Sequence, residues 1–150
     1  MTSKIHTFAL ATLLAVASLT PAMHAQEIIR ATVTVPFSFD YGTTHFGRGT
    51  YVITMNGQNT LLVRNRATSQ AAWAMVQMQF NPTAQKASLV TFKKYGDRYF
   101  LEDVSIAGSG TSVSVYESKP ERQAAQELAQ RGTEATQVAL ALLPVNPFGN

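Results

Sequence analysis

The run FKKYGDRYFLEDV, Phe92 to Val104, predicts the element around which the fold is built. Apolar and aromatic residues alternate with charged ones on both sides of Gly96-Asp97, as expected for two strands joined by a tight turn. Glycine in the first of two loop positions is typical of a type II′ turn, in which that position needs a positive φ. We therefore interpret the run as a β-hairpin.

The two-residue loop determines which residues of the hairpin face each other. One face pairs Lys94–Tyr99, Phe92–Leu101 and Val90–Asp103, with Phe92 and Leu101 pointing to the core, and the other face pairs Tyr95–Arg98, Lys93–Phe100 and Thr91–Glu102. The cation–aromatic pairs among them are each worth about 0.5–1 kcal/mol when exposed. We interpret these pairs as structural. The alternative is a surface contact for a glycan or an acidic polymer, made by Lys93, Tyr95, Arg98 and Phe100.

Other segments of the chain also alternate as strands do. In residues 27–40 every second residue is apolar, and Pro36 predicts that this strand lies at a sheet edge or carries a bulge. Asn56-Gly57 is a hairpin signal, and Ala71–Phe80 is interpreted as a strand, with a helix as the alternative. The expected strands are 27–40, Thr50–Met55, Thr60–Asn65, Ala71–Phe80, the two arms of the hairpin between Ala87 and Ala107, and Thr111–Ser118, with a long turn at 41–50.

The pattern changes near the C-terminus. Ser118 and Glu121 have the spacing of a capping box, and Gly132 is a stop signal, so a helix is expected between them. Residues 136–144 are interpreted as a last strand, with a helix as the alternative. The sequence thus predicts a mainly β fold: an antiparallel β-sandwich or barrel of about seven or eight short strands with one C-terminal α-helix.

The first 25 residues have the features of a secretory signal peptide. Lys4 precedes the uncharged run FALATLLAVASLT, and Ala25 is a small residue at the expected cleavage point. The apolar run is shorter than the roughly twenty residues that a bilayer span needs. We expect an exported protein, periplasmic or released, with no transmembrane helix after cleavage. The expected regions are a signal peptide at 1–25, the β domain with its helix at 26–132, and a last strand or helix with a loose tail at 133–150.

Composition excludes several classes of function. The chain has no cysteine and therefore no disulfide. Two of its three histidines, His6 and His24, lie in the signal region, and His45 alone does not supply the three or four ligands of a zinc site. The formal net charge of +3 falls to +2 without Lys4, and the cations are scattered rather than concentrated in a patch for nucleic acid. We expect no nucleic-acid partner, no metal and no cofactor.

Two sets of residues have the types that catalysis needs. Ser38, Asp40 and His45 are the types of a serine triad, but Ser38 falls within a strand pattern and not on the strained turn that exposes a nucleophile. Glycosidases need two carboxylates facing one cleft. Glu102 and Asp103 are neighbours on a strand and point to opposite faces, although Asp40 and Asp103 are a pair that the sheet could bring together. We predict no catalytic residue and expect a protein that is not an enzyme.

Four short motifs carry a resemblance to a known group. They stand as VPFSF at 35–39, GTYVI at 49–53, YGDRYFL at 95–101 and SKPER at 118–122. In these motifs the chain resembles a group of small exported proteins, mostly from soil acidobacteria, over roughly residues 35–128. It departs from the group at GRG, residues 47–49, where proline-alanine-glycine is common, and in the Val-Ile end of the next strand. The group has no assigned activity, so the resemblance implies export and a common β fold and transfers no functional residue.

Three functions are compatible with these expectations. The first is a non-enzymatic structural or interaction module of the cell envelope, which binds an envelope or extracellular partner through a sheet face or an exposed edge strand. The second is a small β-barrel that carries a hydrophobic ligand. The third, a hydrolase using Asp40, His45 or the strand carboxylates, comes last. The sequence leaves open the ligand or partner and the oligomeric state. In the second function the lumen would be lined by Trp73, Met75, Met78, Phe80 and Phe92.

Overall fold

The protein folds as one mostly antiparallel sheet with a single helix near the C-terminus, which confirms the predicted mainly β class. A computed structural model describes residues 30–57, 59–80 and 86–144, so the expected signal peptide and the end of the tail lie outside the described residues. The elements in chain order are β1 (Arg30–Val35), β2 (Phe39–Tyr41), β3 (Thr44–Phe46), β4 (Gly49–Asn56), β5 (Thr60–Asn65), β6 (Ala71–Phe80), β7 (Leu89–Tyr95), β8 (Arg98–Ser105), β9 (Thr111–Val115), α1 (Lys119–Gln130), β10 (Thr136–Ala141) and β11 (Leu143–Pro144).

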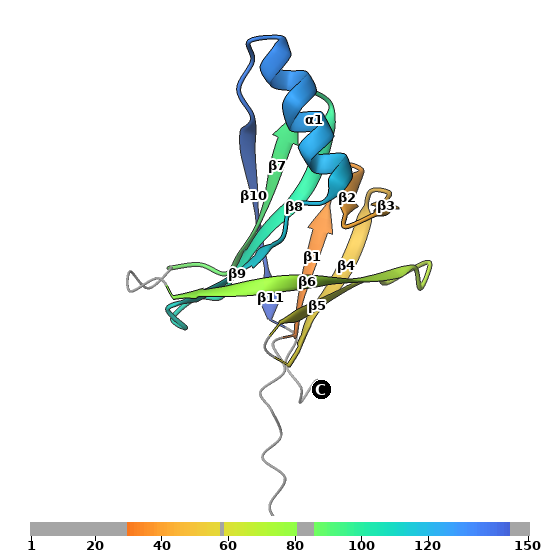
Figure 1. Ribbon diagram of the computed structural model, residues 1–150. Coiled ribbons are helices and arrows are strands. Elements are labelled where there is room, and N and C mark those ends of the chain that lie inside the picture. Colours follow the sequence, from red (N-terminus) through yellow and green to blue (C-terminus); the bar gives the residue numbers. More distant parts are fainter. Residues whose placement is uncertain (1–29, 58, 81–85, 145–150) are drawn as a thin grey trace, which may run out of the picture.

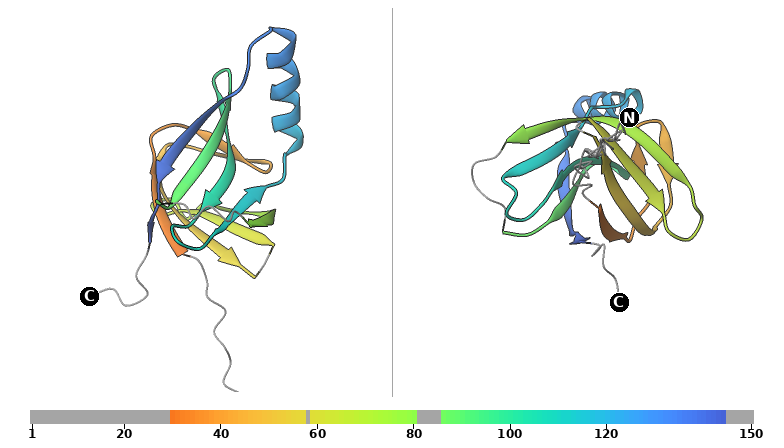
Figure 2. Two further views of the ribbon diagram at one scale, coloured as in Figure 1. Left: turned by 90° about the vertical axis from the view of Figure 1, so that its left-hand side faces the viewer. Right: turned by 90° about the horizontal axis from the view of Figure 1, so that it is seen from below.

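Two segments hold the sheet together by pairing with both of its halves. The first five residues of β6 pair with β5 and the last five pair with β9, so β6 joins the β4–β5 hairpin to the β7–β8–β9 meander. The C-terminal segment pairs with β7 through β10 and with β1 through β11, with only Leu142 between them. The strand order β10-β7-β8-β9-β6-β5-β4-β1-β11 therefore begins and ends on one continuous segment. The sheet curves back on itself, with β6 running crosswise in front of β1 and β8 (Figures 1 and 2).

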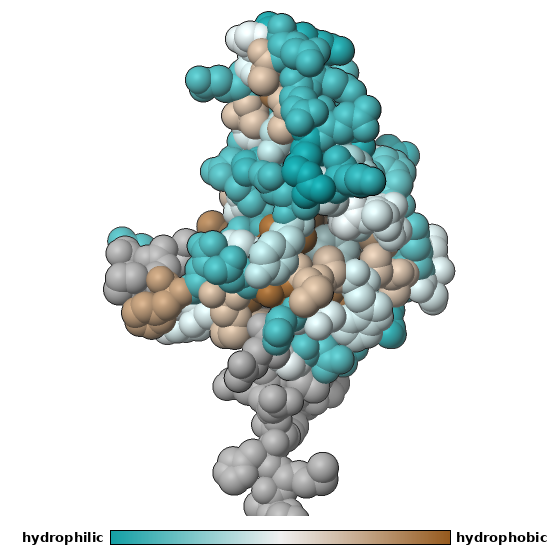
Figure 3. Space-filling view, viewed as in Figure 1, coloured by the Kyte–Doolittle hydropathy of each residue, from teal (hydrophilic) through white to brown (hydrophobic). Residues whose placement is uncertain are grey.

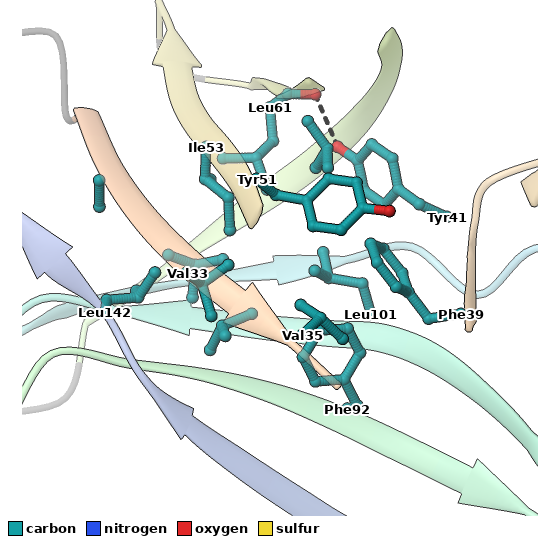
Figure 4. Close-up of a cluster of buried hydrophobic side chains, with 14 of the residues drawn as sticks. Val33, Val35, Phe39, Tyr41, Tyr51, Ile53, Leu61, Phe92, Leu101 and Leu142 are labelled. Atoms are coloured by element: carbon teal, nitrogen blue, oxygen red, sulfur yellow. Dashed lines mark hydrogen bonds between the residues drawn. The ribbon is translucent and has the colours of Figure 1, made fainter. Parts of the chain in front are cut away.

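The interior of this curved sheet is filled by large side chains. Phe39, Phe46, Tyr51 and Phe92 are at most 1% exposed, and the ring of Phe39 lies 5.0–5.3 Å from each of the other three rings. Aliphatic residues from both halves, including Val33, Ile53, Leu101 and Leu142, surround them (Figure 4). Burial of this apolar surface is the main favourable contribution to folding.

The predicted strand at 27–40 is interrupted at Pro36. β1 ends at Val35, and the chain resumes pairing at Phe39 in β2, where it contacts β3 and the parallel strand β8. Proline has no amide hydrogen to donate to a ladder, so the break falls there. Between the strands Phe37 stacks on Tyr99 with ring centroids 4.0 Å apart. The prediction of one continuous strand was wrong, because the segment crosses from one half of the sheet to the other.

The expected long turn at 41–50 also contains a strand. Thr44–Phe46 forms β3, which pairs with β2 so that Phe46 lies opposite Phe39. Phe46 is completely buried in the core, which explains why this glycine-rich stretch is ordered as a hairpin. The prediction missed it because three residues are too few to show a periodic pattern.

The hairpin predicted from Phe92 to Val104 is present, with Gly96 at φ +61°. Its register is confirmed near the turn, from Tyr95–Arg98 to Phe92–Leu101. Beyond Phe92 a bulge shifts the pairing, so the predicted pairs Val90–Asp103 and Thr91–Glu102 were wrong. Val90 faces Val104 instead, and both are at most 2% exposed. The bulge therefore places valine in the core where the regular register would place a carboxylate.

The remaining predicted elements are confirmed. Ala71–Phe80 is a strand, residues 136–144 form strands, and the Asn56-Gly57 hairpin has Gly57 at φ +66°. The helix begins after Ser118, whose Oγ accepts a hydrogen bond from the Glu121 amide at 3.3 Å. The helix ends before Gly132, at φ +67°.

Replacing Gly96 by valine is expected to lower the free energy of unfolding by about 1–2 kcal/mol, because a β-branched residue is strained at a positive φ. A Cβ at this position would meet no atom within 4 Å, so the cost is conformational and not steric. Gly47→Val is the matched control, since Gly47 is equally open and has no positive φ. Urea denaturation measures both variants. If Gly96→Val unfolds like the wild type, the turn is wrongly assigned.

Replacing Tyr41 by phenylalanine is expected to lower the free energy of unfolding by about 1–2 kcal/mol. Tyr41 is 1% exposed, and its hydroxyl donates a hydrogen bond of 2.6 Å to the Leu61 carbonyl, which links β2 to β5 through the core (Figure 4). Removing the hydroxyl of Tyr116 by the same substitution should leave the free energy of unfolding unchanged, because Tyr116 is 57% exposed. Equal losses from Tyr41→Phe and Tyr116→Phe in urea denaturation would contradict this role for the buried bond.

Candidate functional site

The predicted contact residues Lys93, Tyr95, Arg98 and Phe100 do not form an open surface. Tyr95 is 8% and Phe100 is 1% exposed, because α1 packs along this face of the hairpin. Ala124 and Leu128 of the helix complete a second, small core with the two rings, as the position of α1 beside β7 and β8 indicates (Figure 2). The expectation of an exposed contact was wrong for Tyr95 and Phe100, since sequence alternation alone does not show which sheet face a later helix will cover.

Lys93 belongs to a cluster of charges at the base of the helix. Its Nζ lies 3.4 Å from Glu102 Oε1 and 3.8 Å from Glu117 Oε1. Burial alone would lower the pKa of Lys93, but the charges of Glu102, Tyr95 and Glu117 outweigh it and raise the pKa. The Tyr95 hydroxyl donates to Glu121 Oε1 at 3.5 Å. These contacts hold the helix to the hairpin, which supports the structural interpretation of Lys93 and Tyr95.

Arg98 connects the hairpin to a pocket that it forms with residues of β2 and β3. Its guanidinium carbon lies 4.9 Å from the centre of the Phe100 ring, and Nη2 donates to Asp40 Oδ2 at 3.0 Å. The sequence predicted cation–aromatic pairs of Tyr95 with Arg98 and of Lys93 with Phe100 instead. The observed cation–aromatic contacts are Arg98 with Phe100 and Lys94 with Tyr99, whose Nζ lies 5.3 Å from the ring centre.

Asp40 bridges a histidine and an arginine in this pocket. Its other oxygen, Oδ1, lies 2.7 Å from His45 Nδ1. The pocket has a volume of about 220 Å³ and is lined by the residue before β2 and by residues of β2, β3, the β7–β8 turn and the start of β8: Ser38, Phe39, Asp40, His45, Asp97, Arg98 and Tyr99. Ser38, Asp40 and His45, whose types are those of a serine triad, thus line one pocket, and Ser38 lies directly before β2 and not in a strand.

The pocket has part of the geometry of an acid–base site. An aspartate that binds one ring nitrogen of histidine orients the imidazole, and the His45 side chain is 69% exposed. The hydrogen bonds of the described residues do not include one between Ser38 and His45, so no activated nucleophile is formed. Asp103 lies elsewhere: burial raises its pKa, and its Oδ2 accepts a hydrogen bond from Ser114 at 3.0 Å. Asp40 is best explained as the residue that ties β2 and β3 to the start of β8.

The structure also exposes a set of large apolar side chains on a sheet face. The core-facing residues of β1, β4 and β5 alternate with outward-facing ones, and the register continues this outward face onto Ala71–Met75 of β6. Trp73 and Met75 lie there, 54% and 66% exposed, and Leu62 lies directly opposite Trp73. We name this side of β1, β4, β5 and residues 71–75 the arginine–tryptophan face. Figure 3 shows apolar and neutral colours gathered along β6, below the hydrophilic region of α1.

The charges of the arginine–tryptophan face are of one sign. Arg30 and Arg64 point outward from β1 and β5, and Arg66 lies in the turn that follows β5; all three are exposed. No ion pair between described residues includes them. The strands β1, β4, β5, β6 and β11 contain no aspartate or glutamate. The face thus combines exposed arginines with an exposed tryptophan and lacks carboxylates.

The sequence assigned Trp73 and Met75 a role only in the alternative of a ligand-carrying barrel, as lining of its lumen, and did not identify this face. One signal was available in the sequence. Trp73 and Met75 alternate with Ala72 and Ala74, and the small alanines are the residues that fit against the core, so Trp73 and Met75 should point away from it. The absence of any acid between Asp40 and Asp97 was another. The charge pattern did not identify the face, because the strands had first to be paired.

Comparison with protein-family models, with curated proteins and with solved structures found no match to this chain. Among the described residues no group of three or more histidine, aspartate or glutamate side chains is placed to hold a metal ion. The described part also contains no helix of the length and hydropathy needed to cross a membrane.

Replacing Glu121 by glutamine is expected to stabilise the protein at pH 7. Burial, together with the nearby Glu117 carboxylate, raises the pKa of Glu121. The ionised form therefore destabilises the fold at neutral pH, and this cost disappears as the pH falls through the raised pKa toward the ordinary value of about 4.3. The stability difference between Glu121→Gln and the wild type should accordingly shrink from pH 7 to pH 4 in urea denaturation. A difference that is constant or grows as the pH falls would contradict the raised pKa.

Proposed function

We propose that the protein is an exported, non-enzymatic interaction module that binds a component of the cell envelope through the arginine–tryptophan face. The observation that carries this proposal is the exposure of Trp73 and Met75 on an outward sheet face, beside exposed arginines that form no ion pair with any described residue. Tryptophan and arginine are the residues that most often dominate binding energy at interfaces. The signal-like first 25 residues and the resemblance to small exported proteins support the location.

The alternative, a barrel that carries a hydrophobic ligand, receives less support. Of the five residues that would line its lumen, Trp73, Met75, Met78 and Phe80 are 46–79% exposed. The fifth, Phe92, is completely buried among other aromatic rings, in edge-to-face contact with Phe37 and Phe39. The side chains proposed for the cavity thus either face outward or fill the core.

A hydrolase receives support from one contact, the 2.7 Å bond between His45 and Asp40. The other Asp40 oxygen is bound to Arg98, and no hydroxyl is hydrogen-bonded to the imidazole among the described residues. If the wild type hydrolyses any tested substrate, the double variant Asp40→Asn/His45→Ala should abolish that turnover. Unchanged turnover would remove this function.

The proposed function is tested by co-sedimentation of the purified protein with an envelope fraction of the organism that makes it. The double variant Trp73→Ala/Met75→Ser is expected to lose most of the binding. The matched control is Met78→Ser/Phe80→Ser, which removes two exposed apolar side chains from the other half of the same strand. Both variants should keep the wild-type circular dichroism spectrum, because these side chains lie outside the core.

The comparison of the two variants decides the outcome. Loss of binding in Trp73→Ala/Met75→Ser but not in the control supports the arginine–tryptophan face as the binding surface. Wild-type binding by Trp73→Ala/Met75→Ser, or equal losses in both variants, would overturn the proposal.

A further inference from the structure

We propose that the component bound by the arginine–tryptophan face is a carboxylate-bearing polysaccharide. This inference rests on the proposed function and names the chemistry of its partner. Three features of the face lead to it: the sign of its charge, the chemistry of its neutral residues, and the position of its tryptophan.

The charge of the face requires an anionic partner. Arg30, Arg64 and Arg66 are exposed, and the strands that form the face contain no carboxylate that would compete for them. The planar guanidinium presents parallel N–H groups that match the two oxygens of a carboxylate. Of the acids in the described part of the chain, Glu102, Glu117 and Glu121 are gathered at the base of the helix. A partner with repeated negative charges is therefore attracted to one side of the molecule.

The neutral residues distinguish a polysaccharide from a lipid surface. Much of the face between the arginines consists of hydroxyl groups, contributed by Thr32, Thr34, Thr50, Thr54 and Thr60. Thr34 and Thr50 lie opposite each other with their Oγ1 atoms 3.2 Å apart. Hydroxyls buried against lipid tails would lose their hydrogen bonds to water, which is unfavourable. Sugar hydroxyls can replace those bonds, since each hydroxyl both donates and accepts.

Trp73 supplies a stacking surface at the edge of this array. It is 54% exposed, and its cross-strand neighbour Leu62 is 8% exposed although it points outward. The register places Arg64 two residue pairs further along, opposite Ala71, as the next pair on the same face. An indole is a large apolar surface with a polar N–H. It therefore suits the C–H face of a sugar ring whose carboxylate reaches the arginine.

The chain contains one tryptophan, so its fluorescence reports on this face alone. Titration of the purified protein with polygalacturonate and with alginate should shift the emission of Trp73 to shorter wavelength, because the bound chain excludes water from the indole. Dextran, a neutral polysaccharide, should leave the emission unchanged. Raising the salt concentration from about 50 to about 200 mM should weaken binding, because the arginine contacts are exposed and therefore screened.

Variants test the two kinds of contact by calorimetric titration with polygalacturonate. Arg64→Gln/Arg66→Gln should weaken binding by about tenfold or more, whereas Lys119→Gln/Arg131→Gln makes the same change in net charge on and beside α1 and should leave affinity near that of the wild type. Trp73→Ala should also weaken binding by about tenfold, and Phe80→Ser should not. Equal losses in the two charge variants would indicate non-specific attraction and would overturn the inference.

The titrations with polyuronates and the co-sedimentation with the envelope fraction test different claims, so the failure of one can be told from the failure of the other. Vesicles of phosphatidylglycerol are titrated in parallel: a response to vesicles but to neither polyuronate overturns the polysaccharide in favour of a lipid surface. No response to either polyuronate, while envelope binding still depends on Trp73, overturns the polysaccharide and leaves the proposed function standing. Envelope binding that is independent of Trp73 overturns the proposed function itself.

Discussion

The structure depends on one strand, β6, that hydrogen-bonds to both halves of the sheet. Its first five residues pair with β5 and its last five pair with β9. Without β6, the backbone groups along the facing edges of β5 and β9 would lack these hydrogen bonds. Each half of β6 has a partner strand on one side only, and only Val76 at its centre is buried among its ten side chains. The strand that connects the two halves is thus exposed over most of its length, and this is why the apolar side chains of Trp73 and Met75 are not covered.

The helix has the opposite effect on the other side of the molecule. It covers the outer face of the β7–β8 hairpin, where Tyr95 and Phe100 would otherwise be exposed, and it brings Glu121 into partly apolar surroundings. The concentrated aromatic and charged residues of that hairpin are therefore used to attach α1. The face that lacks a covering helix is the one formed by β1, β4, β5 and β6, and the proposed binding function is assigned there for this reason.

Local signals in the sequence predicted most elements but not how they pack. The Gly96 turn, the Ser118 cap and the strand at Ala71–Phe80 follow from short-range rules on φ, capping and alternation, and all three are present. The bulge at Phe92, the strand β3 and the break at Pro36 depend on which side chains reach the shared core, which one segment does not reveal. The candidate site was missed for the same reason: Arg30 and Arg64 come to lie on one face only once β1, β4 and β5 are paired.

The closure of the sheet by its last residues determines when this protein can fold. Residues 136–144 pair with β7 through one part and with β1 through the other, although residues 36–88 separate these two strands in the sequence. A chain that is synthesised or translocated from its amino end therefore exposes both open edges until these residues emerge. Closing contacts of such long sequence separation form slowly. Closure of the sheet is thus the last step that the topology allows, because both open edges wait for residues 136–144.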